Sequence, residues 1–543
     1  MNYDAILFTD LSDYFIPTKV EGAYAIASHL RKHDYSVKVI DNFVWILENN
    51  VQELFSYLDN HVGDNTRFIG FSTTFCRYFE SFEPSLRGSF DMKMEIMERL
   101  PTTKDTLKNL ENLIDRIYFI YPHVKIVVGG QGGQTHSLCT VFEDKIDCWI
   151  RGLGEDSILQ YMQNLDEGID NSSFMEDKFS SNLDFHNIGP VFHVDDLIFQ
   201  NEVLPFTVSR GCRFKCKFCT YSLLGRKPSD NYVRSEESMY VEFMHNYENF
   251  QTTFYMFTDD TLNESINKLE RIGRAIERTG IDINFWAYIR IELLERFPEQ
   301  IPLLGEMGIR AAFFGLESLN DASAKAIGKG IGRERVLKTL QAARDSWGEY
   351  ARLHGSFIIG LPYETKETAS EWTRLLIERK ILLDTISIHG LHMTSPKTLA
   401  KGNTSRFNFS EFELNREKYG YFNTPDGMWK NEHWTQSEAR EFAIDVIKSF
   451  EEYDPTYDEC KQGQNTVACM NLRIVDPSLT WEDVHEWMDE KQYKVFLDQI
   501  LNAKKIILDN YVERVFKKCI TMLYFSQTFL NIIYLSKLRV RMI

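Results

Sequence analysis

Three cysteines in one short stretch constrain this 543-residue chain more than any other feature. The cysteines are Cys212, Cys216 and Cys219. They follow an apolar run ending at Val208, which has the pattern of a strand that enters a tight loop. Three thiolates in one loop can bind three irons of a cubane [4Fe–4S] cluster and leave the fourth iron open, whereas structural clusters and zinc sites use all their positions. A zinc knuckle, the alternative, needs a fourth Cys or His at comparable spacing, but the next such residue is His245.

An aromatic residue, Phe218, stands directly before the last cysteine. With it, the C-x3-C-x2-C motif resembles the signature of the radical S-adenosylmethionine (SAM) superfamily. The resemblance implies that the three cysteines bind a [4Fe–4S] cluster whose open iron chelates the amino and carboxylate groups of SAM. It also implies an external electron donor of the flavodoxin or ferredoxin type, cleavage of SAM to methionine and a 5′-deoxyadenosyl radical, and hydrogen abstraction from an unactivated C–H bond.

Six apolar strands alternate with helices from residue 204 to about residue 391. The first precedes the cysteines, and the others are predicted at 254–257, 285–288, 311–314, 356–359 and 385–388. Six repeats match the partial (β/α)6 barrel of radical SAM cores, which we place at residues 201–395. Active sites of such barrels gather at the carboxyl ends of the strands.

Polar groups that suit SAM follow these strands. Three patterns resemble, in order, the characteristic motifs of radical SAM enzymes that carry an N-terminal cobalamin-type domain. They are Phe-x-Asp-Asp-Thr, Gly-Leu-Glu-Ser and Gly-Leu-Pro-x-Glu-Thr. A guanidinium suits the methionyl carboxylate, acids suit ribose or ammonium, and a glycine allows close approach to adenine. Any one of these acids alone is as well explained as a loop carboxylate or helix cap. The expected SAM contacts are Phe218, Asp259, Asp260, Arg290, Glu317, Ser318 and Gly360.

Residues 1–165 also alternate strand and helix, which predicts a Rossmann-like (flavodoxin-like) domain with a parallel sheet covered on both faces. Ligands of such sheets bind beyond the carboxyl ends of the strands. The glycines and polar residues there resemble the cobalamin-binding domain that precedes the core in one radical SAM subclass, except for an insertion at about 76–103. The resemblance implies cobalamin contacts at Thr9, Asp10, Ser72, Thr73, Gly129, Gly130, Gln131, Gly154 and Glu155.

One motif of cobalamin proteins is missing from its usual place. Methionine-synthase-like proteins carry Asp-x-His-x-x-Gly after the first strand, and its histidine ligates cobalt. Here a literal match occurs only at Asp184–Gly189, inside the polar stretch 166–200 that we interpret as a linker, so a chance match is favoured over His186 as a ligand. Two alternatives stay open: cobalamin binds without a protein histidine, or the domain binds none and serves packing or substrate binding.

Composition excludes several other classes. A formal net charge of −18 disfavours nucleic acid as a partner, because phosphate-backbone affinity depends on clustered Lys and Arg. No run of about eighteen apolar residues indicates a membrane span. The N-terminus reads as a first strand rather than a signal peptide, and the nine cysteines show no disulfide framework, which together indicate a cytoplasmic protein.

Residues 396–543 are predicted to be mainly helical and to close the barrel mouth over the substrate.

The sequence therefore predicts a radical SAM enzyme, a cobalamin-dependent methyltransferase that acts on an unactivated carbon of a small molecule or peptide. The alternative within enzymes is a radical SAM oxidoreductase, cyclase or epimerase that binds no cobalamin. A non-catalytic iron–sulfur electron-transfer protein is the alternative from another class, and it leaves the predicted SAM-contacting motifs unexplained. No residue pattern identifies a catalytic residue, the substrate or the oligomeric state.

Overall fold

The computed structural model describes most of the chain. The described residues are 2–10, 18–72, 103–130, 142–176, 186–187, 189–219, 232–393, 410–425, 427–453, 467, 469–489 and 493–516. The predicted contacts Thr73 and Gln131 therefore lie outside the described residues. The insertion predicted at 76–103 also lies outside them, apart from residue 103.

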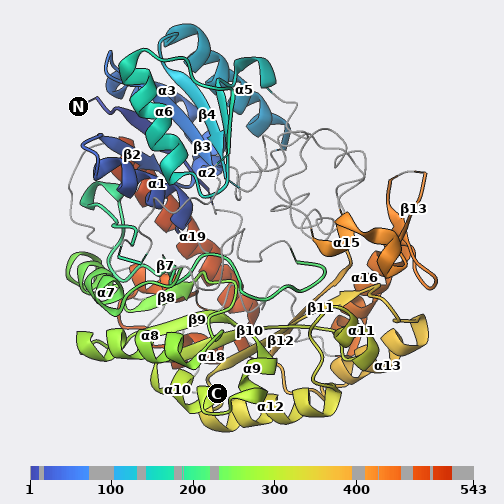
Figure 1. The fold of residues 1–543 in the computed structure, drawn as a ribbon. Coiled ribbons are helices and arrows are strands. Elements are labelled where there is room, and N and C mark those ends of the chain that lie inside the picture. Colours follow the sequence, from blue (N-terminus) through green and yellow to red (C-terminus); the bar gives the residue numbers. More distant parts are fainter. Residues whose placement is uncertain are drawn as a thin grey trace.

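A six-stranded parallel sheet in the order β2-β1-β3-β4-β5-β6 forms the N-terminal domain. Its strands are β1 (Ala5–Phe8), β2 (Val37–Ile40), β3 (Phe68–Ser72), β4 (Lys125–Gly129), β5 (Cys148–Arg151) and β6 (Phe174–Glu176). Helices cover both faces (Figure 1). One face carries α1 (Glu21–Arg31) and α6 (Glu155–Glu167), and the other carries α2 (Phe43–Asn49), α3 (Val51–His61) and α5 (Thr103–Ile120). The predicted doubly covered parallel sheet is confirmed, and β6 is an addition.

Alternation along the strands explains why both faces are buried. Leu7 and Val39 belong to the same buried cluster as Tyr24 of α1, whereas Ile6 and Phe8 belong to the cluster on the opposite face. Successive side chains of a strand point to opposite faces, so a strand covered on both sides needs an unbroken apolar run.

A second six-stranded parallel sheet follows, in the sequential order β7 to β12. Its strands are β7 (Leu204–Phe206), β8 (Phe254–Phe257), β9 (Asn284–Ile289), β10 (Ile309–Glu317), β11 (Arg352–Ile359) and β12 (Thr385–Gly390). The helices between them are α7 (Glu236–Phe250), α8 (Ile266–Thr279), α9 (Ile291–Arg296), α10 (Gln300–Glu306), α11 (Asp321–Ala326), α12 (Arg333–Trp347) and α13 (Lys366–Ile377). All six predicted strands are present, and no pairing joins β7 to β12, so the barrel is partial as predicted.

The C-terminal region consists of two parts. The first contains α15 (Glu411–Leu414), β13 (Phe422–Asn423), β14 (Trp429–Lys430) and α16 (Gln436–Tyr453), and α16 packs on β12 and α13. The second contains the 3-10 helix η9 (Cys469–Ile474), α18 (Trp481–Asp489) and α19 (Tyr493–Phe516).

The second part begins at the opposite end of the barrel from the mouth. Asn471 accepts a hydrogen bond from the backbone N–H of Val203 at 2.6 Å, one residue before β7. The indole N–H of Trp481 donates to the carbonyl of Tyr350 at 2.8 Å, two residues before β11. Residues 469–489 thus cover the amino ends of the strands, whereas the sequence placed the whole region at the mouth. Aromatic and apolar side chains of this segment, such as Leu472 and Trp481, are buried in one cluster with Phe254 and Trp286 of the barrel.

Helix α19 then joins the two domains (Figure 1). The Tyr511 hydroxyl accepts a hydrogen bond from the backbone N–H of Asp41 at 2.7 Å, directly after β2. Lys19 lies between the carboxylates of Asp41, at 3.5 Å, and Glu202, at 3.4 Å, and all of these groups are buried. The N-terminal domain, the barrel and α19 therefore share one polar junction inside a continuous core.

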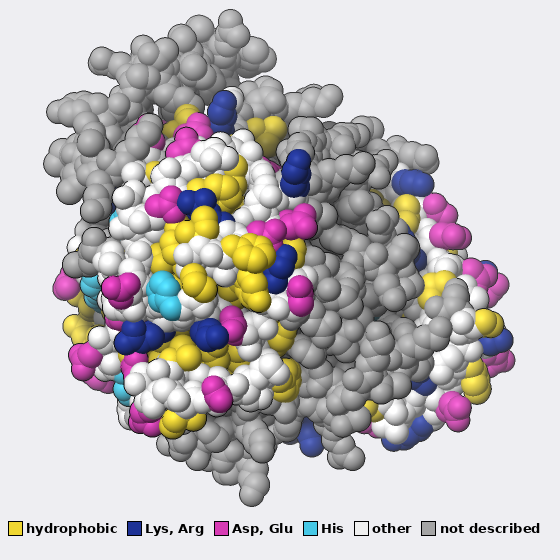
Figure 2. Space-filling view, turned by 90° about the horizontal axis from the view of Figure 1, so that it is seen from above, with side chains coloured by type: hydrophobic (Ala, Val, Ile, Leu, Met, Phe, Trp, Pro, Cys, Tyr) yellow, Lys and Arg dark blue, Asp and Glu magenta, His cyan; other side chains and the backbone are white. Residues whose placement is uncertain are grey.

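Two further features concern the surface. No helix among the described residues has both the length and the apolar character needed to cross a membrane. On the face shown in Figure 2, Lys and Arg side chains alternate with Asp and Glu rather than forming one continuous basic patch among the residues drawn in colour.

We expect Tyr511→Phe to lower the free energy of unfolding by about 1–3 kcal/mol, because it leaves the buried N–H of Asp41 without an acceptor. Urea unfolding followed by tryptophan fluorescence measures this. Tyr118→Phe removes a hydroxyl from an exposed tyrosine and should leave the midpoint unchanged. Equal midpoints for Tyr511→Phe and wild type would contradict the role given to the junction.

Candidate active site

The loop after β7 carries the three cysteines, all of them half-buried. The N–H of Cys219 donates to the carbonyl of Cys216 at 3.1 Å, which makes the second half of the motif a tight turn. The sulfur of Cys212 lies 3.3 Å from the Thr261 hydroxyl, and the sulfur of Cys216 accepts a hydrogen bond from Arg290 at 3.1 Å. Polar groups from the ends of β8 and β9 thus hold two of the three sulfurs.

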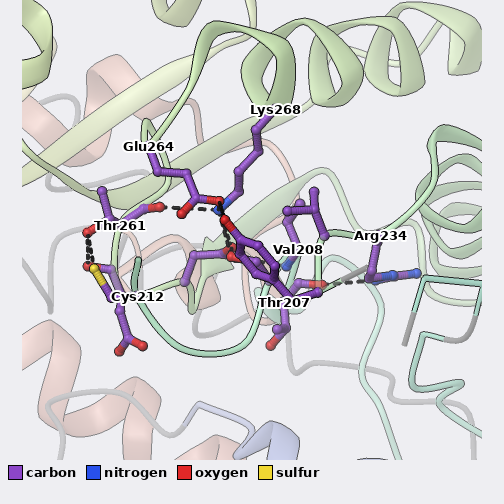
Figure 3. A network of polar contacts seen from close by, with 12 residues as sticks. Thr207, Val208, Cys212, Arg234, Thr261, Glu264 and Lys268 are labelled. Atoms are coloured by element: carbon purple, nitrogen blue, oxygen red, sulfur yellow. Dashed lines mark hydrogen bonds and ion pairs between the residues drawn. The ribbon is translucent and has the colours of Figure 1, made fainter. Parts of the chain in front are cut away.

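A buried ammonium group fixes this loop to the barrel (Figure 3). Lys268 of α8 donates to the carboxylate of Asp259 at 2.8 Å and to the hydroxyl of Ser209 at 2.7 Å. Asp259 also accepts from the N–H of Val208 at 2.7 Å and from the hydroxyl of Ser209 at 2.5 Å. Both oxygens of Asp259 are therefore engaged inside the protein, and its contacts are those of a residue that positions the cysteine loop.

Asp260, the next residue, is placed differently. It is half-buried and lines the cavity described below, whereas Asp259 does not. Burial, together with the neighbouring charge of Asp259, raises the pKa of Asp260 to about 7. Of the two adjacent acids, Asp260 is the one that a ligand can reach.

Arg290 and Glu317 both have protein partners. Besides Cys216, Arg290 donates to the carbonyl of Gly328 at 2.9 Å and pairs with Glu292 at 3.2 Å. Glu317 pairs with Lys329 at 2.9 Å, and its backbone has a φ of +65° at the end of β10. In this structure Arg290 is bound to the cluster loop, so pairing with a methionyl carboxylate requires it to share or exchange these partners.

Gly360 is approached closely, but by protein. It has a φ of +90°, and a Cβ there would lie 2.6 Å from the indole of Trp429. The Gly360 carbonyl accepts a hydrogen bond from Tyr421 at 2.9 Å. Trp429 and Trp434 are both buried, so these two side chains of the C-terminal region serve packing rather than contact with a substrate.

Glu364, which the sequence did not single out, organises this strand end. It accepts hydrogen bonds from the N–H of Gly360 at 2.8 Å and from the indole of Trp372 at 3.1 Å. Ser318, an expected SAM contact, lies 3.4 Å from it. Burial raises the pKa of Glu364 to about 7. Its position inside Gly-Leu-Pro-x-Glu-Thr was the available signal.

A cavity of about 320 Å³ lies between the two domains. The carboxyl ends of the N-terminal strands form one wall and the ends of β7 and β8 form the other. Five of the nine residues predicted to contact cobalamin line it: Ser72, Gly129, Gly130, Gly154 and Glu155. Thr9 and Asp10 are buried and do not line it. Asp10 accepts a hydrogen bond from the N–H of Val44 at 2.7 Å and so holds the start of α2.

Two sets of polar contacts join the two domains at the wall of this cavity. Arg210, two residues before Cys212, pairs with Glu155 of α6 at 2.5 Å. Oε2 of Glu21 in α1 is hydrogen-bonded to the hydroxyls of Thr207 and Thr258, the residues after β7 and β8. Glu21 and Arg210 had no signal in the sequence, because their partners are at least fifty residues away along the chain.

Comparison with known proteins identifies the second domain. Residues 206–376 match the model of the radical SAM superfamily. These residues form a radical SAM domain.

Relatives of this chain are found among methyltransferases. An uncharacterised methyltransferase of Pyrococcus horikoshii, PH0819, is 28% identical over 243 residues, or 41% of this chain and 50% of that protein. Bacteriochlorophyllide d C-8(2)-methyltransferase of Chlorobaculum tepidum is 24% identical over 283 residues, or 48% of this chain and 59% of that protein. The chain thus spans about half the length of the curated relatives it matches.

A solved structure matches nearly the whole fold. The radical SAM methyltransferase TsrM from Kitasatospora setae, with cobalamin and a [4Fe–4S] cluster bound, superposes with a TM-score of 0.56 at 12% identity. The match covers 93% of this chain and 100% of that chain. At this identity the likeness concerns the fold: a Rossmann-like sheet domain joined to a radical SAM barrel.

The cysteine loop suits an iron–sulfur cluster. Within the described part of the chain, no three His, Cys, Asp or Glu side chains converge on a single ion. A cubane does not need such convergence, because each thiolate binds its own iron. Burial raises the pKa of the Cys212 thiol, and metal binding favours the thiolate form. The Thr261 hydroxyl can stabilise a thiolate at Cys212, and Arg290 can stabilise one at Cys216.

The cavity suits cobalamin. Among the described residues of its wall, Glu21 Oε1 and Glu155 Oε2 are buried acceptors without a hydrogen-bond partner. The rim of a corrin carries amide groups that donate N–H bonds, which such acceptors require. No described histidine lines the cavity, and His186 instead contacts the carbonyl of Val233 at 2.9 Å, in keeping with a chance motif match.

Glu364 makes stability depend on pH. Its folded pKa, about 7, lies above its ordinary value of 4.5, so its stabilising contribution is complete below pH 4.5 and is lost as pH rises through 7. We expect Glu364→Gln to remove about 2 kcal/mol of the decline in wild-type stability between pH 5 and 8. Urea unfolding at four pH values in this range measures it.

The control is Glu306→Gln, which changes an exposed glutamate at the end of α10. It should keep the wild-type slope of stability against pH. A Glu364→Gln slope equal to that of wild type would show that Glu364 is ionised in the folded protein throughout this range.

Proposed function

We propose that this chain is a cobalamin-dependent radical SAM methyltransferase that methylates an unactivated carbon of a small molecule or peptide. The cavity between the two domains carries the proposal. Its walls are the ligand-binding edge of a Rossmann-like sheet and the strand ends next to the cysteine loop. A cofactor bound to the first domain therefore meets the mouth of the second.

The proposal assigns two cofactors to the residues described above. When bound, the cluster supplies an electron that cleaves SAM, and cobalamin carries a methyl group from SAM to the substrate. Cys212, Cys216 and Cys219 bind the cluster, and Asp259 with Lys268 holds their loop against β8. Phe218, Asp260, Arg290, Glu317, Ser318 and Gly360 remain the proposed SAM contacts.

Other residues position the methyl donor, and the two domains exclude water from it and from the substrate. Glu155 and Arg210 join α6 to the residues just before the first cysteine, so they set the distance between the cobalamin and cluster sites. Glycines at strand ends, such as Gly129 and Gly154, leave space for a corrin to approach the backbone. Enclosure by two domains protects a carbon radical from quenching.

The comparisons support methyl transfer as the reaction. Both curated relatives are named as methyltransferases, and TsrM is described with cobalamin and a [4Fe–4S] cluster bound. We place the protein in the reducing environment that such a cluster needs, with a flavodoxin- or ferredoxin-type electron donor.

The first test is metal content. After anaerobic purification with hydroxocobalamin supplied, we expect about four irons and one cobalt per chain. Cys216→Ala should lose the iron, because two thiolates do not retain the cubane. Cys469→Ala, which changes a buried thiol at the barrel floor, should keep it. Zinc in place of iron would end the proposal.

The second test is the fate of SAM. Incubation of the reduced holoenzyme with SAM, without substrate, should yield about one S-adenosylhomocysteine per bound cobalt, together with slow release of 5′-deoxyadenosine. Chromatography of the quenched mixture measures both. 5′-Deoxyadenosine alone from cobalt-loaded protein would refute methyl transfer and point to an oxidoreductase, cyclase or epimerase.

A further inference from the structure

Three oxygen atoms from the two domains meet at the wall of the cavity. They are Oε2 of Glu21 and the hydroxyl oxygens of Thr207 and Thr258. The two hydroxyls lie 2.5 Å apart, the Thr258 hydroxyl lies 2.9 Å from Glu21 Oε2, and Thr207 is hydrogen-bonded to the same oxygen. The three atoms therefore form a closed ring of contacts.

The number of hydrogens in this ring indicates the charge of Glu21. Two hydroxyls supply two hydrogens, and three contacts need three. An ionised carboxylate supplies none, whereas a carboxylic acid supplies the third. All three contacts can therefore be hydrogen bonds only when Glu21 is protonated.

The surroundings of Glu21 agree with the neutral form. Burial raises the pKa of Glu21, and this effect outweighs the lowering by the hydrogen bonds from Thr207 and Thr258 and by the charges of Arg210 and Arg234. Arg210 is itself paired with Glu155, and Arg234 with Glu242. Both cations near Glu21 therefore have another carboxylate to neutralise.

The other oxygen of Glu21, Oε1, makes no hydrogen bond to any described residue. This oxygen is buried, although Glu21 lines the cavity. A buried acceptor left unpaired is costly, and an occupant with N–H donors would satisfy it.

We propose that Glu21 binds the cobalamin as a neutral carboxyl group, with Oε2–H completing the ring to Thr207 and Thr258 and Oε1 accepting a hydrogen bond from a corrin amide. This inference rests on the proposed function, since it requires cobalamin in the cavity. It assigns cofactor recognition to a residue that was not among the nine cobalamin contacts predicted from the sequence.

The first experiment measures affinity. The full-length protein is titrated anaerobically with hydroxocobalamin, and the quenching of tryptophan fluorescence gives Kd. Glu21→Met removes the acceptor at similar length and should raise Kd about three- to tenfold, the effect of one net hydrogen bond. Glu21→Ala provides the same test should the methionine variant unfold. Glu21→Gln should stay within about twofold, because its amide oxygen can take the place of Oε1.

The second experiment separates direct contact from a role in positioning. Infrared difference spectra, recorded before and after hydroxocobalamin is added, should show a carboxylic acid C=O band that shifts in wild type. The shift should be missing in Glu21→Gln and retained in Glu53→Gln, which changes an exposed glutamate on α3. A purely structural Glu21 would leave the band in place.

The outcomes are distinguishable. Wild-type protein that binds no hydroxocobalamin refutes the proposed function, and this inference fails with it. Wild-type protein that binds, together with Glu21→Met and Glu21→Ala variants of equal Kd, refutes the inference alone. A raised Kd without a band shift in wild type also refutes it, because Glu21 then acts through the ring and not on the cofactor.

Discussion

The buried ammonium of Lys268 is the constraint on which the site depends. Its side chain is 1% exposed, and that of Asp259, its partner, is 0% exposed. Removing one partner of such a pair leaves an uncompensated buried charge, which typically costs about 3–5 kcal/mol. The pair also binds Val208 and Ser209, just before the cysteines. The position of the cysteine loop thus depends on the barrel core, and a displacement of either one displaces the other.

The same loop is held from the other domain. Arg210 lies between Ser209, which belongs to the Lys268 network, and Gly211, which lines the cavity, and it pairs with Glu155 across that cavity. Within five residues the chain therefore passes from a barrel contact through an interdomain ion pair to Cys212, the first cysteine of the motif. Under the proposed function, this short stretch of chain joins the cobalamin and cluster sites.

Much of this architecture could be predicted from residues close together in the sequence. The apolar runs at Ile6 and Phe285 are recognisable strands, and the spacing from Cys212 to Cys219 indicates a cluster without knowledge of the fold. Contacts between distant residues could not be predicted. Arg290 binds Cys216 from 74 residues away, and Glu21 meets Thr258 from 237 residues away. Asp259 and Asp260 look equivalent in the sequence, and only the direction of each side chain separates a positioning residue from one that a ligand can reach. The C-terminal region was predicted to cover the barrel, but the helical pattern of its sequence cannot tell which end of the barrel it covers.

Tyr511 has a consequence for the order of assembly. Its hydroxyl completes the junction at Asp41, yet it follows both domains along the chain. Domains generally fold as units from the N-terminal side during synthesis. The sheet domain and the barrel can therefore both be folded while α19 is still absent. The contacts that fix the two domains to each other at this junction are completed last, after each domain has formed its own core.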